Sequence, residues 1–536
     1  MRRIRLNNYF IFTLALFITL MFYFISPPKV YFERSKIAIS PLEELLPLMP
    51  TSIPIKKEVK AKVELKDNKD VNKIKNIKNK DNKKEVKIAN KKVEKIRVKE
   101  EKKVVVPVKE IKKDRKKENK PGKIKENKPD LKKINEKIWD SIKNEVKHNK
   151  EHLDCKKLIN GDQNYIKLQS QTRITYKDPE KLLMDCNSIK ERNYFADKAL
   201  SNEENKYPLA YARIVYKDYR FLEAELATNY HPQNFYCFAV DSKASDIFLK
   251  RIKSLAKCFP NIIIPTIRYS VDREGHFTEN AFMSCLEELS KKQYKWEYIF
   301  TLLNYDLQIK TNQEIIKILK LLEGANDVEY EFKNQDKQNM TKSLNNKFNW
   351  TFKDLNLFKD EKLNYQVDNK GKPLSLKLSK GYVQTSLARP FVDFITQKLN
   401  LNKMIEQLNS WDNGAHELFF QSLVASDGLK APNGFTHKCI EKKVDVPYIT
   451  RFSIWGKSSK CHSRHLIKNI CIFGIEDLAT NIRDSKYLFI NKMSPDFDFG
   501  AILCWHEEMR SRTLVDKGVN RLNIKYYQNW PQAIIK

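Results

Sequence analysis

The chain changes its pattern of apolar and polar positions twice. Residues 9–26 form an uncharged apolar run, and residues 56–149 set isolated aliphatic residues among many lysines. From about residue 150 onward, apolar positions recur at the spacings of strands and helices. We therefore predict one folded domain, residues 151–536, preceded by an apolar segment and a charged segment that differ from it in kind.

In the folded part, short apolar runs typical of buried strands alternate with helical patterns. Strands are predicted at 207–215, 234–240, 261–267 and 296–303, and helices at 218–229, 244–256, 277–291 and 313–322. Four such units in succession predict an open, mainly parallel α/β sheet flanked by helices. Residues 340–380 are expected to form a long irregular loop over the site. Strand and helix patterns resume at 377–383 and 389–399.

Two carboxylates follow predicted strands. Asp241 ends the second strand, and Asp306 comes shortly after the fourth. Ligands of open α/β sheets bind beyond the carboxyl ends of the strands, so both residues are candidates for a ligand site. For Asp241, capping of the strand end is the structural alternative.

The apolar run at the N-terminus predicts a membrane anchor. Arg2, Arg3 and Arg5 precede it, and its 18 residues at about 1.5 Å each nearly cross a bilayer core of roughly 30 Å. We expect residues 1–8 to be a cytoplasmic tail, 9–26 a transmembrane signal anchor, and the rest lumenal. A cleaved signal peptide is the alternative. The length of the run and the prolines after Ser26 disfavour it.

The charge of the chain is concentrated in one segment. The 536 residues carry 100 Lys+Arg and 67 Asp+Glu, and residues 51–150 alone hold 36 and 17 of them. With few large apolar residues, this stretch cannot offset the entropy of ordering, so residues 27–150 are predicted to be a disordered stem. A polyanion-binding arm is the alternative. Aromatic platforms for bases are absent there, which disfavours nucleic acid as a partner.

Cysteines enter the chain only at Cys155, and there are nine. Their confinement to the expected lumenal part indicates disulfides plus one leftover thiol. Sequons at Asn339 and Asn349 fit the same compartment. The segment CHSRHLIKNIC offers two Cys and two His, which raises the alternative of a zinc-stabilised nucleic-acid binder. Its spacing has no C-x-x-C pair, and we disfavour it.

Several blocks of the folded part resemble one enzyme family. PLAYARIVYKD, HPQNFYCFAVDSK, AKCFPNIII, LNYDLQIKTNQEI and KNICIFGIEDL are similar, in order and spacing, to the core-2/I-branching β-1,6-N-acetylglucosaminyltransferases. The resemblance runs from about Cys155 to Met509. It implies a type II Golgi membrane enzyme with a GT-A-like nucleotide-sugar transferase domain. Such an enzyme transfers GlcNAc from UDP-GlcNAc to a 6-hydroxyl of a glycan or glycoprotein, with inversion and without a metal cofactor.

The resemblance also implies a disulfide pattern, which the sequence alone leaves open among 105 connectivities for eight cysteines. Cys439 is left as a free thiol. The implied pairs are Cys155–Cys504, Cys186–Cys258, Cys237–Cys285 and Cys461–Cys471.

Carried over residue by residue, the resemblance assigns catalytic roles. Glu417, in WDNGAHELFFQSL, matches the general base, and a simple first-turn helix charge is the alternative. The preceding residue, commonly Asp in the family, is His416. Lys468 and Lys492 match the basic positions that stabilise the departing diphosphate. Replacing the usual Arg by Lys468 keeps the charge and loses the bidentate fork.

Nucleotide contacts are implied at three further places, where Arg273 departs in type from the family residue. Asp496-Phe497-Asp498 superficially offers a DxD metal motif, but it lies late in the chain and away from the early sheet, so we do not interpret it as one. The implied nucleotide-binding residues are Ile214, Val215, Tyr216, Asp241, Ser242, Lys243 and Arg273.

The acceptor positions match less well. Glu329, Lys337 and Trp455 align with sugar-contacting residues, while Met340 and Lys457 stand where the family has Arg and Tyr. Trp455 is expected to stack on a sugar, with a buried tryptophan as the alternative. A catalytically inactive, lectin-like relative, or a transferase of the same fold using UDP-xylose, are the competing functions.

Overall fold

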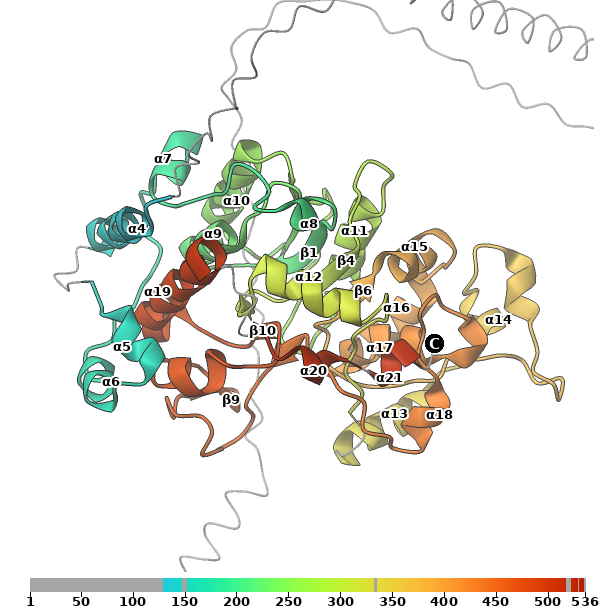
Figure 1. Cartoon of the computed structure of the whole chain (residues 1–536). Helices are drawn as coiled ribbons and strands as arrows, with labels where there is room; N and C mark the ends of the chain where they lie inside the picture. The colour runs from blue at the N-terminus through green and yellow to red at the C-terminus, as the bar shows by residue number, and fades with distance from the viewer. Residues whose placement is uncertain (1–128, 147–151, 332–334, 517–521, 529, 535–536) are drawn as a thin grey trace, which may run out of the picture. The chain divides into compact units, whose positions relative to one another are not determined.

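The computed structural model describes residues 129–146, 152–331, 335–516, 522–528 and 530–534 (Figure 1). The predicted tail (1–8), the predicted anchor (9–26) and the predicted stem as far as residue 128 lie outside these residues. Of the helices in the described ranges, none is both long and apolar enough to span a membrane.

A five-stranded sheet forms the centre of the domain, in the order β3-β2-β1-β4-β6. The first four of these strands run parallel to their neighbours, and β6 joins β4 antiparallel. The prediction of a mixed α/β fold with a parallel sheet is thereby confirmed. The strands are β1 (Leu209–Val215), β2 (Phe235–Val240), β3 (Ile262–Ile263), β4 (Tyr298–Leu302) and β6 (Ser386–Ala388).

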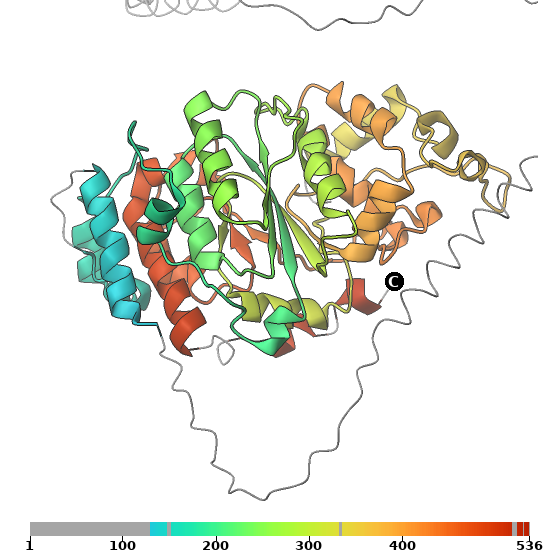
Figure 2. The same cartoon turned by 90° about the horizontal axis from the view of Figure 1, so that it is seen from above.

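Side chains alternate between the two faces of the sheet along each strand, and both faces are buried. Tyr211 and Val215 of β1 belong to one core, together with side chains of α9, α10 and α19. Ala210 and Ala212 belong to the other core, where their small side chains let α11 pack closely. Figure 2 shows helices on both sides of the sheet. These four helices are α9 (Tyr219–Asn229), α10 (Asp246–Cys258), α11 (Thr278–Leu289) and α19 (Pro495–Ser511).

Further helices surround this centre. Before β1 lie α4 (Leu131–Val146), α5 (Cys155–Asn160), α6 (Gln163–Ser170), α7 (Cys186–Glu191) and α8 (Asn202–Asn205). Between β5 and β7 lie α12 (Asn312–Leu321), α13 (Gln335–Lys347), α14 (Phe352–Leu355), α15 (Arg389–Gln397), α16 (Asn402–Asn409), α17 (Phe419–Ala425) and α18 (His437–Glu441). Near the C-terminus lie α20 (Ile524–Tyr527) and α21 (Pro531–Ile534).

Short elements complete the site region. A small sheet has the order β5-β10-β7, and β8 and β9 form a separate hairpin. These strands are β5 (Leu307–Gln308), β7 (Arg451–Phe452), β8 (Leu466–Ile467), β9 (Ile470–Cys471) and β10 (Phe489–Ile490). Single turns include η1 (Glu361–Tyr365), η2 (Ala415–Leu418), η3 (Asp427–Leu429), η4 (Ile475–Asp477), η5 (Leu478–Ile482) and η6 (Arg512–Asp516).

The eight predicted elements of the central sheet are all present, with shifted ends. The third strand is much shorter than predicted, because the chain leaves the sheet after Ile263. The predicted irregular loop at 340–380 is wrong in part: it contains most of α13, with α14 and η1, and Leu344 and Phe352 are fully buried. No strand forms at 377–383. That segment bonds instead to residues 329, 417 and 422.

The predicted domain boundary at residue 150 is too late. Helix α4 lies inside the predicted stem and packs beside α19, as both views show (Figures 1 and 2). Ile138, Trp139 and Ile142 are buried, at the spacing of one helical face. The surrounding lysines hid this pattern, since they occupy the exposed face of the same helix.

Four disulfides hold the domain, and they are the four pairs that the resemblance implied. Cys439 is free and partly buried. The bonds are Cys155–Cys504, Cys186–Cys258, Cys237–Cys285 and Cys461–Cys471.

Candidate active site

The carboxyl ends of β1 and β2 meet at one edge of the sheet. The Asp241 N–H donates to the Val215 carbonyl at 2.9 Å, which joins the two strand ends. Tyr216, the next residue after β1, is 42 % exposed, whereas Ile214 and Val215 are buried in the cores. The predicted uracil-side wall therefore presents Tyr216 to solvent, and the two aliphatic residues support it from within.

Asp241 begins a tight turn at this edge. Its carboxylate accepts the Lys243 N–H at 2.8 Å, which is the local capping contact that was the structural alternative. The Ser242 N–H donates to the Tyr269 carbonyl at 2.9 Å, and Lys243 Nζ donates to the Val271 carbonyl at 2.7 Å. The tripeptide is thus fixed against the chain that follows β3.

Four cations gather beyond the same strand ends, and we call Lys217, Arg451, Lys468 and Lys492 the basic cluster. Burial lowers the pKa of Lys492, and the positive charges of Lys468, Arg451 and Lys217 lower it further. The ring of Tyr305 underlies two of these groups, with Lys217 Nζ at 5.6 Å and Lys492 Nζ at 5.9 Å from its centroid. Such a group of cations favours a multiply charged anion.

A tight hairpin presents Lys468. Strands β8 and β9 are joined by Lys468 and Asn469, whose φ angles of 51° and 64° fit the two-residue hairpin turn with two left-handed positions. The Gly456 N–H donates to the Asn469 carbonyl at 2.8 Å. The hairpin tip is therefore held from both its own strands and the neighbouring chain.

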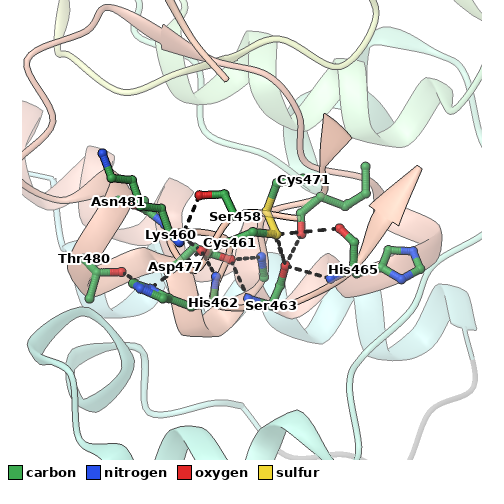
Figure 3. The surroundings of a disulfide bond; sticks show 12 residues. Ser458, Lys460, Cys461, His462, Ser463, His465, Cys471, Asp477, Thr480 and Asn481 are labelled. Atoms are coloured by element: carbon green, nitrogen blue, oxygen red, sulfur yellow. Dashed lines mark hydrogen bonds and ion pairs between the residues drawn. A yellow bond between two sulfur atoms is a disulfide. The ribbon is translucent and has the colours of Figure 1, made fainter. Parts of the chain in front are cut away.

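The Cys461–Cys471 bond closes the base of this hairpin (Figure 3). Ser463 donates to the Ile472 carbonyl at 2.6 Å, and His462 Nδ1 lies 2.7 Å from Thr480 Oγ1. Both cysteines of the segment are in the disulfide and are unavailable as thiolate ligands. This contradicts the alternative of a zinc site, which the spacing of the segment had already disfavoured.

A buried polar network lies under the basic cluster. Asp306 is fully buried and accepts from Gln384 Nε2 at 3.0 Å and from Asn491 Nδ2 at 2.8 Å. The oxygens of these two amides accept from Arg451, at 3.0 and 2.9 Å. Asp306 therefore orients Arg451 and the residue before Lys492, and it does not face a ligand.

Glu417 lies on the short turn η2, ahead of α17. Lys380 Nζ is 3.2 Å from Glu417 Oε2 and donates to the Gly414 carbonyl at 3.0 Å. The Lys380 side chain is 7 % exposed and that of Glu417 is 22 % exposed. The Gly381 N–H also donates to the Glu417 carbonyl, at 2.9 Å. The carboxylate thus remains accessible while its backbone and one oxygen are anchored.

Tyr382 links Glu417 to the basic cluster. Its ring lies 4.4 Å from the Arg451 guanidinium carbon, and its hydroxyl accepts from Trp455 Nε1 at 2.7 Å. Burial raises the pKa of Tyr382 to about 12, and the carboxylates of Glu329 and Glu417 add to this. A carboxylate, a cation and an exposed indole therefore surround one phenol.

Two of the predicted acceptor residues meet at this phenol. Glu329 Oε2 accepts the Tyr382 N–H at 2.9 Å, and Trp455, 46 % exposed, lies parallel to the Tyr382 ring. Trp455 is not a buried core tryptophan. It also pairs with Ile470 of the hairpin that carries Lys468. The structure brings Glu417, Glu329, Trp455 and Lys468 into one region.

The other predicted residues make no contact with this group that the described side chains show. Arg273 is exposed and pairs with the neighbouring Glu274. Lys337 belongs to α13, and its side chain is outside the described part of the chain. Asn339 and Asn349 are both exposed, as sequons must be to be used.

The last aspartate of the DxD-like triplet has a structural role. Asp498 is buried, and its carboxylate accepts from Arg173 at 2.5 Å and from the N–H groups of Ile475 and Ala501. Elsewhere, His152, Cys155 and Glu507 bring possible metal-ligand atoms within 4.8 Å of one another. Cys155 is held in a disulfide there.

Sequence reasoning missed several residues of the site. Lys217 lies two residues after the end of β1, so the expectation of ligand-binding residues beyond the strand ends could have found it. Lys380, Tyr382 and Arg451 carried no local signal. Lys380 and Tyr382 lie in the segment 377–383, which was wrongly predicted as a strand, and Arg451 lies in the two-residue strand β7. Only tertiary contacts bring these residues together.

Comparison with known proteins places the chain in a family. The family model described as "Core-2/I-Branching enzyme" matches residues 209–481. A human β-1,3-galactosyl-O-glycosyl-glycoprotein β-1,6-N-acetylglucosaminyltransferase is 28 % identical over 390 residues, covering 68 % of this chain and 86 % of that protein. The Bos taurus protein of the same name is 30 % identical over 387 residues, with the same shares.

Among the solved structures matched is the mannosyltransferase Ktr4p from S. cerevisiae in complex with GDP. The likeness has a TM-score of 0.22 and 13 % identity, covering 56 % of this chain and 82 % of that chain, and it carries no argument. The sequence matches define the class: the chain is a glycosyltransferase. It belongs to the Core-2/I-branching enzyme family.

Proposed function

We propose that the chain transfers GlcNAc from UDP-GlcNAc to a hydroxyl of a glycan, forming a β-1,6 branch on an O-glycan or a related acceptor. The observation that carries this proposal is the basic cluster beside an accessible carboxylate, Glu417, and an exposed indole, Trp455. The names of the relatives support the donor sugar and the linkage.

In this reaction Glu417 acts as the general base. The acceptor hydroxyl attacks the anomeric carbon of GlcNAc while its proton passes to the Glu417 carboxylate. The bond from that carbon to UDP breaks on the opposite face, so the configuration inverts. Lys380 keeps the carboxylate oriented, because its ammonium group bonds to both Glu417 and the Gly414 carbonyl.

The leaving group carries the developing negative charge. Lys468 and Lys492 are proposed to bind its phosphates, with Lys217 and Arg451 adding positive potential. We propose that these cations do the work of a metal ion, so that this transfer needs none. Tyr216 and the turn 241–243 are proposed to hold the uridine. Arg273, two residues after Val271, which accepts from Lys243, is proposed as a further nucleotide contact.

The acceptor is proposed to bind on Trp455 and Glu329, with Lys337 as a further contact. A sugar ring stacked on the half-exposed indole would lie beside Tyr382, which also neighbours Glu417. Because Met340 and Lys457 replace family residues, the acceptor can differ from that of the relatives.

We further propose that this GT-A-like domain is lumenal, in the Golgi, and is tethered by the anchor 9–26 and a stem. The family relationship and the four disulfides support an oxidising compartment. Since α4 is part of the fold, the stem is proposed to end near residue 128.

The test is a transfer assay with UDP-GlcNAc and UDP-xylose, each offered with a glycopeptide carrying a β-1,3-galactosyl O-glycan. GlcNAc transfer with a β-1,6 product linkage supports the proposal. Transfer from UDP-xylose but not from UDP-GlcNAc would show that the donor sugar is xylose. UDP and glycan binding without any turnover would identify an inactive, lectin-like relative.

A further inference from the structure

Two segments distant in sequence are joined beside Glu417. We call residues 271–280, at the start of α11, the entry loop, and residues 409–416 the pre-base segment. The Phe277 N–H donates to Asn409 Oδ1 at 2.6 Å, and Asn409 Nδ2 donates to Asn280 Oδ1 at 2.9 Å. The Gly414 N–H donates to the Glu274 carbonyl, at 2.9 Å. The pre-base segment therefore takes its position from the entry loop.

Close packing strengthens this junction. Gly275 has a φ of 98°, and a Cβ placed there would lie 1.7 Å from His416 Nδ1. The His416 ring occupies the space that any side chain at position 275 would need. His416 is the residue directly before Glu417, so the entry loop contacts the chain immediately next to the proposed base.

The His276 ring bridges the two segments. Its Nδ1 lies 2.6 Å from Asp272 Oδ2, and its Nε2 lies 2.8 Å from the Trp411 carbonyl oxygen. The ionised Asp272 carboxylate and the Trp411 carbonyl can only accept hydrogen bonds. A neutral imidazole has one N–H to donate, whereas the imidazolium has two. Both contacts are therefore satisfied only when His276 is protonated.

We infer that His276 is a positioning residue for Glu417: its imidazolium pins the Trp411 carbonyl and so fixes the pre-base segment. This inference rests on the proposed function of Glu417. The protonated ring holds Trp411 three residues before Gly414, whose carbonyl in turn accepts from Lys380. Loss of the proton removes one of the two bonds and loosens the segment that ends at the base.

The charges around the ring favour its protonated form. Asp272 and Glu274 lie on its own loop, and together with the Trp411 carbonyl they raise the pKa of His276. Partial burial opposes ionisation of Asp272, but hydrogen bonds from the His276 ring and the loop amides lower the pKa of that carboxyl.

The other titratable groups near His276 lie on the elements packed against its loop. Burial lowers the pKa of His416 to about 4, so that ring is neutral and adds no repulsion near pH 7. Burial raises the pKa of Glu279, on α11, to about 8. On the pre-base segment Asp412 is exposed, and Lys347 of α13 lies 5.3 Å from the Trp411 ring centroid.

The sign of the pH dependence follows from the raised pKa. The bridge contributes fully below the ordinary histidine pKa of about 6.5, and it is lost as pH rises through the higher native value. The pre-base segment is thus most firmly held in mildly acidic solution.

Hydrogen exchange of the full chain tests this without using activity. In the native chain, peptides spanning 409–418 should lose protection as pH rises from 6 to 9, after correction for intrinsic exchange. The His276→Gln chain should show low protection at all pH values, lower by about ten- to a hundredfold at pH 6, the range for a lost hydrogen bond to a charged group. His152→Gln, which alters a histidine paired with Glu507 elsewhere, should leave these peptides unchanged.

Asp272→Asn provides the second variant, should His276→Gln fail to fold. It retains the shape but removes the charge that stabilises the imidazolium, so the pH of the transition should fall. Identical, pH-independent protection in the native, His276→Gln and Asp272→Asn chains would overturn the inference. A fully active Glu417→Gln chain would instead overturn the proposed role of Glu417 as general base, and the exchange data would still report the bridge.

Discussion

Lys380 Nζ lies 3.2 Å from Glu417 Oε2, and these two residues come from segments 37 positions apart. Neither belongs to the central sheet. The buried ammonium also bonds to the Gly414 carbonyl, so a single cation fixes both the carboxylate and the start of the turn that carries it. A base held in this way can accept a proton without first reorganising.

Glu417→Gln should abolish transfer while UDP binding remains. The amide keeps the size of the side chain but cannot take the acceptor proton, and losing a general base costs about 10² to 10⁴ in rate. Radiolabelled transfer and calorimetric UDP titration measure the two effects. Glu406→Gln, an exposed glutamate on α16, is the matched control. Near-native transfer by Glu417→Gln would reduce this carboxylate to a helix-start charge.

The enzyme should remain active in EDTA, since lysines rather than a metal are proposed to bind the diphosphate. Lys468→Gln and Lys492→Gln should each weaken UDP binding by about ten- to a hundredfold, as expected for a lost hydrogen bond to a charged group. Lys442→Gln, exposed beyond α18, should bind UDP normally. A strict requirement for Mn²⁺ would contradict the metal-free proposal.

Trp455→Ala should raise the KM for the acceptor and leave UDP affinity unchanged. The indole is 46 % exposed and also donates to the Tyr382 hydroxyl, so it is placed to stack on a sugar without belonging to the core. The loss should be about three- to tenfold, the size of an aromatic contact. Trp455→Phe, which retains a ring, should recover part of it. Steady-state kinetics with varied acceptor provide the measurement.

A fragment beginning at residue 151 should be less stable than one beginning at 129. Glu145 of α4 accepts from Arg220, which is fully buried, at 3.1 Å, and from the Tyr176 hydroxyl at 2.6 Å. Arg220 keeps Glu223 as a partner, so the loss of its hydrogen bonds to Glu145 should cost about 1.5–3 kcal/mol of unfolding free energy. Denaturant titration of both fragments measures this. Glu136→Gln, at an exposed pair on the same helix, should cost little. Equal stabilities would mean that α4 is dispensable.

Peptide mapping without reduction should recover the four disulfides, and Cys439 alone should react with an alkylating agent in the native chain. After reduction in denaturant, all nine cysteines should react. A bridge that uses Cys439, or zinc in stoichiometric amount, would contradict the pairing.

The four parallel strands of the central sheet were predictable because each lies in a continuous apolar run followed by a helical pattern, whereas the antiparallel strand β6 was not predicted. Strands buried on both faces need such runs, so β1 and β2 stand out in the sequence. Helix α4 was missed for the opposite reason. Its apolar residues recur every three or four positions, and the lysines between them dominate the composition.

The site was predictable only in part. The strand-end rule found Asp241 and Asp306 alike, but it could not tell that amide side chains bury and saturate Asp306. The family resemblance supplied Glu417, Lys468 and Trp455. Arg451 is placed by the pairing of β7 with β10, and Tyr382 comes to it from a distant part of the chain. Such long-range contacts leave no local pattern in a single sequence.

The Cys155–Cys504 bond turns nearly the whole domain into a covalent ring. The other three disulfides lie within one side or the other of the stretch from Cys285 to Cys461. A protease that cuts once in that stretch would open the chain without releasing a piece, because the ring still joins both halves. Such nicked molecules would run at full mass until reduced. Damage in the segments around the acceptor residues would therefore stay hidden from any sizing done under oxidising conditions.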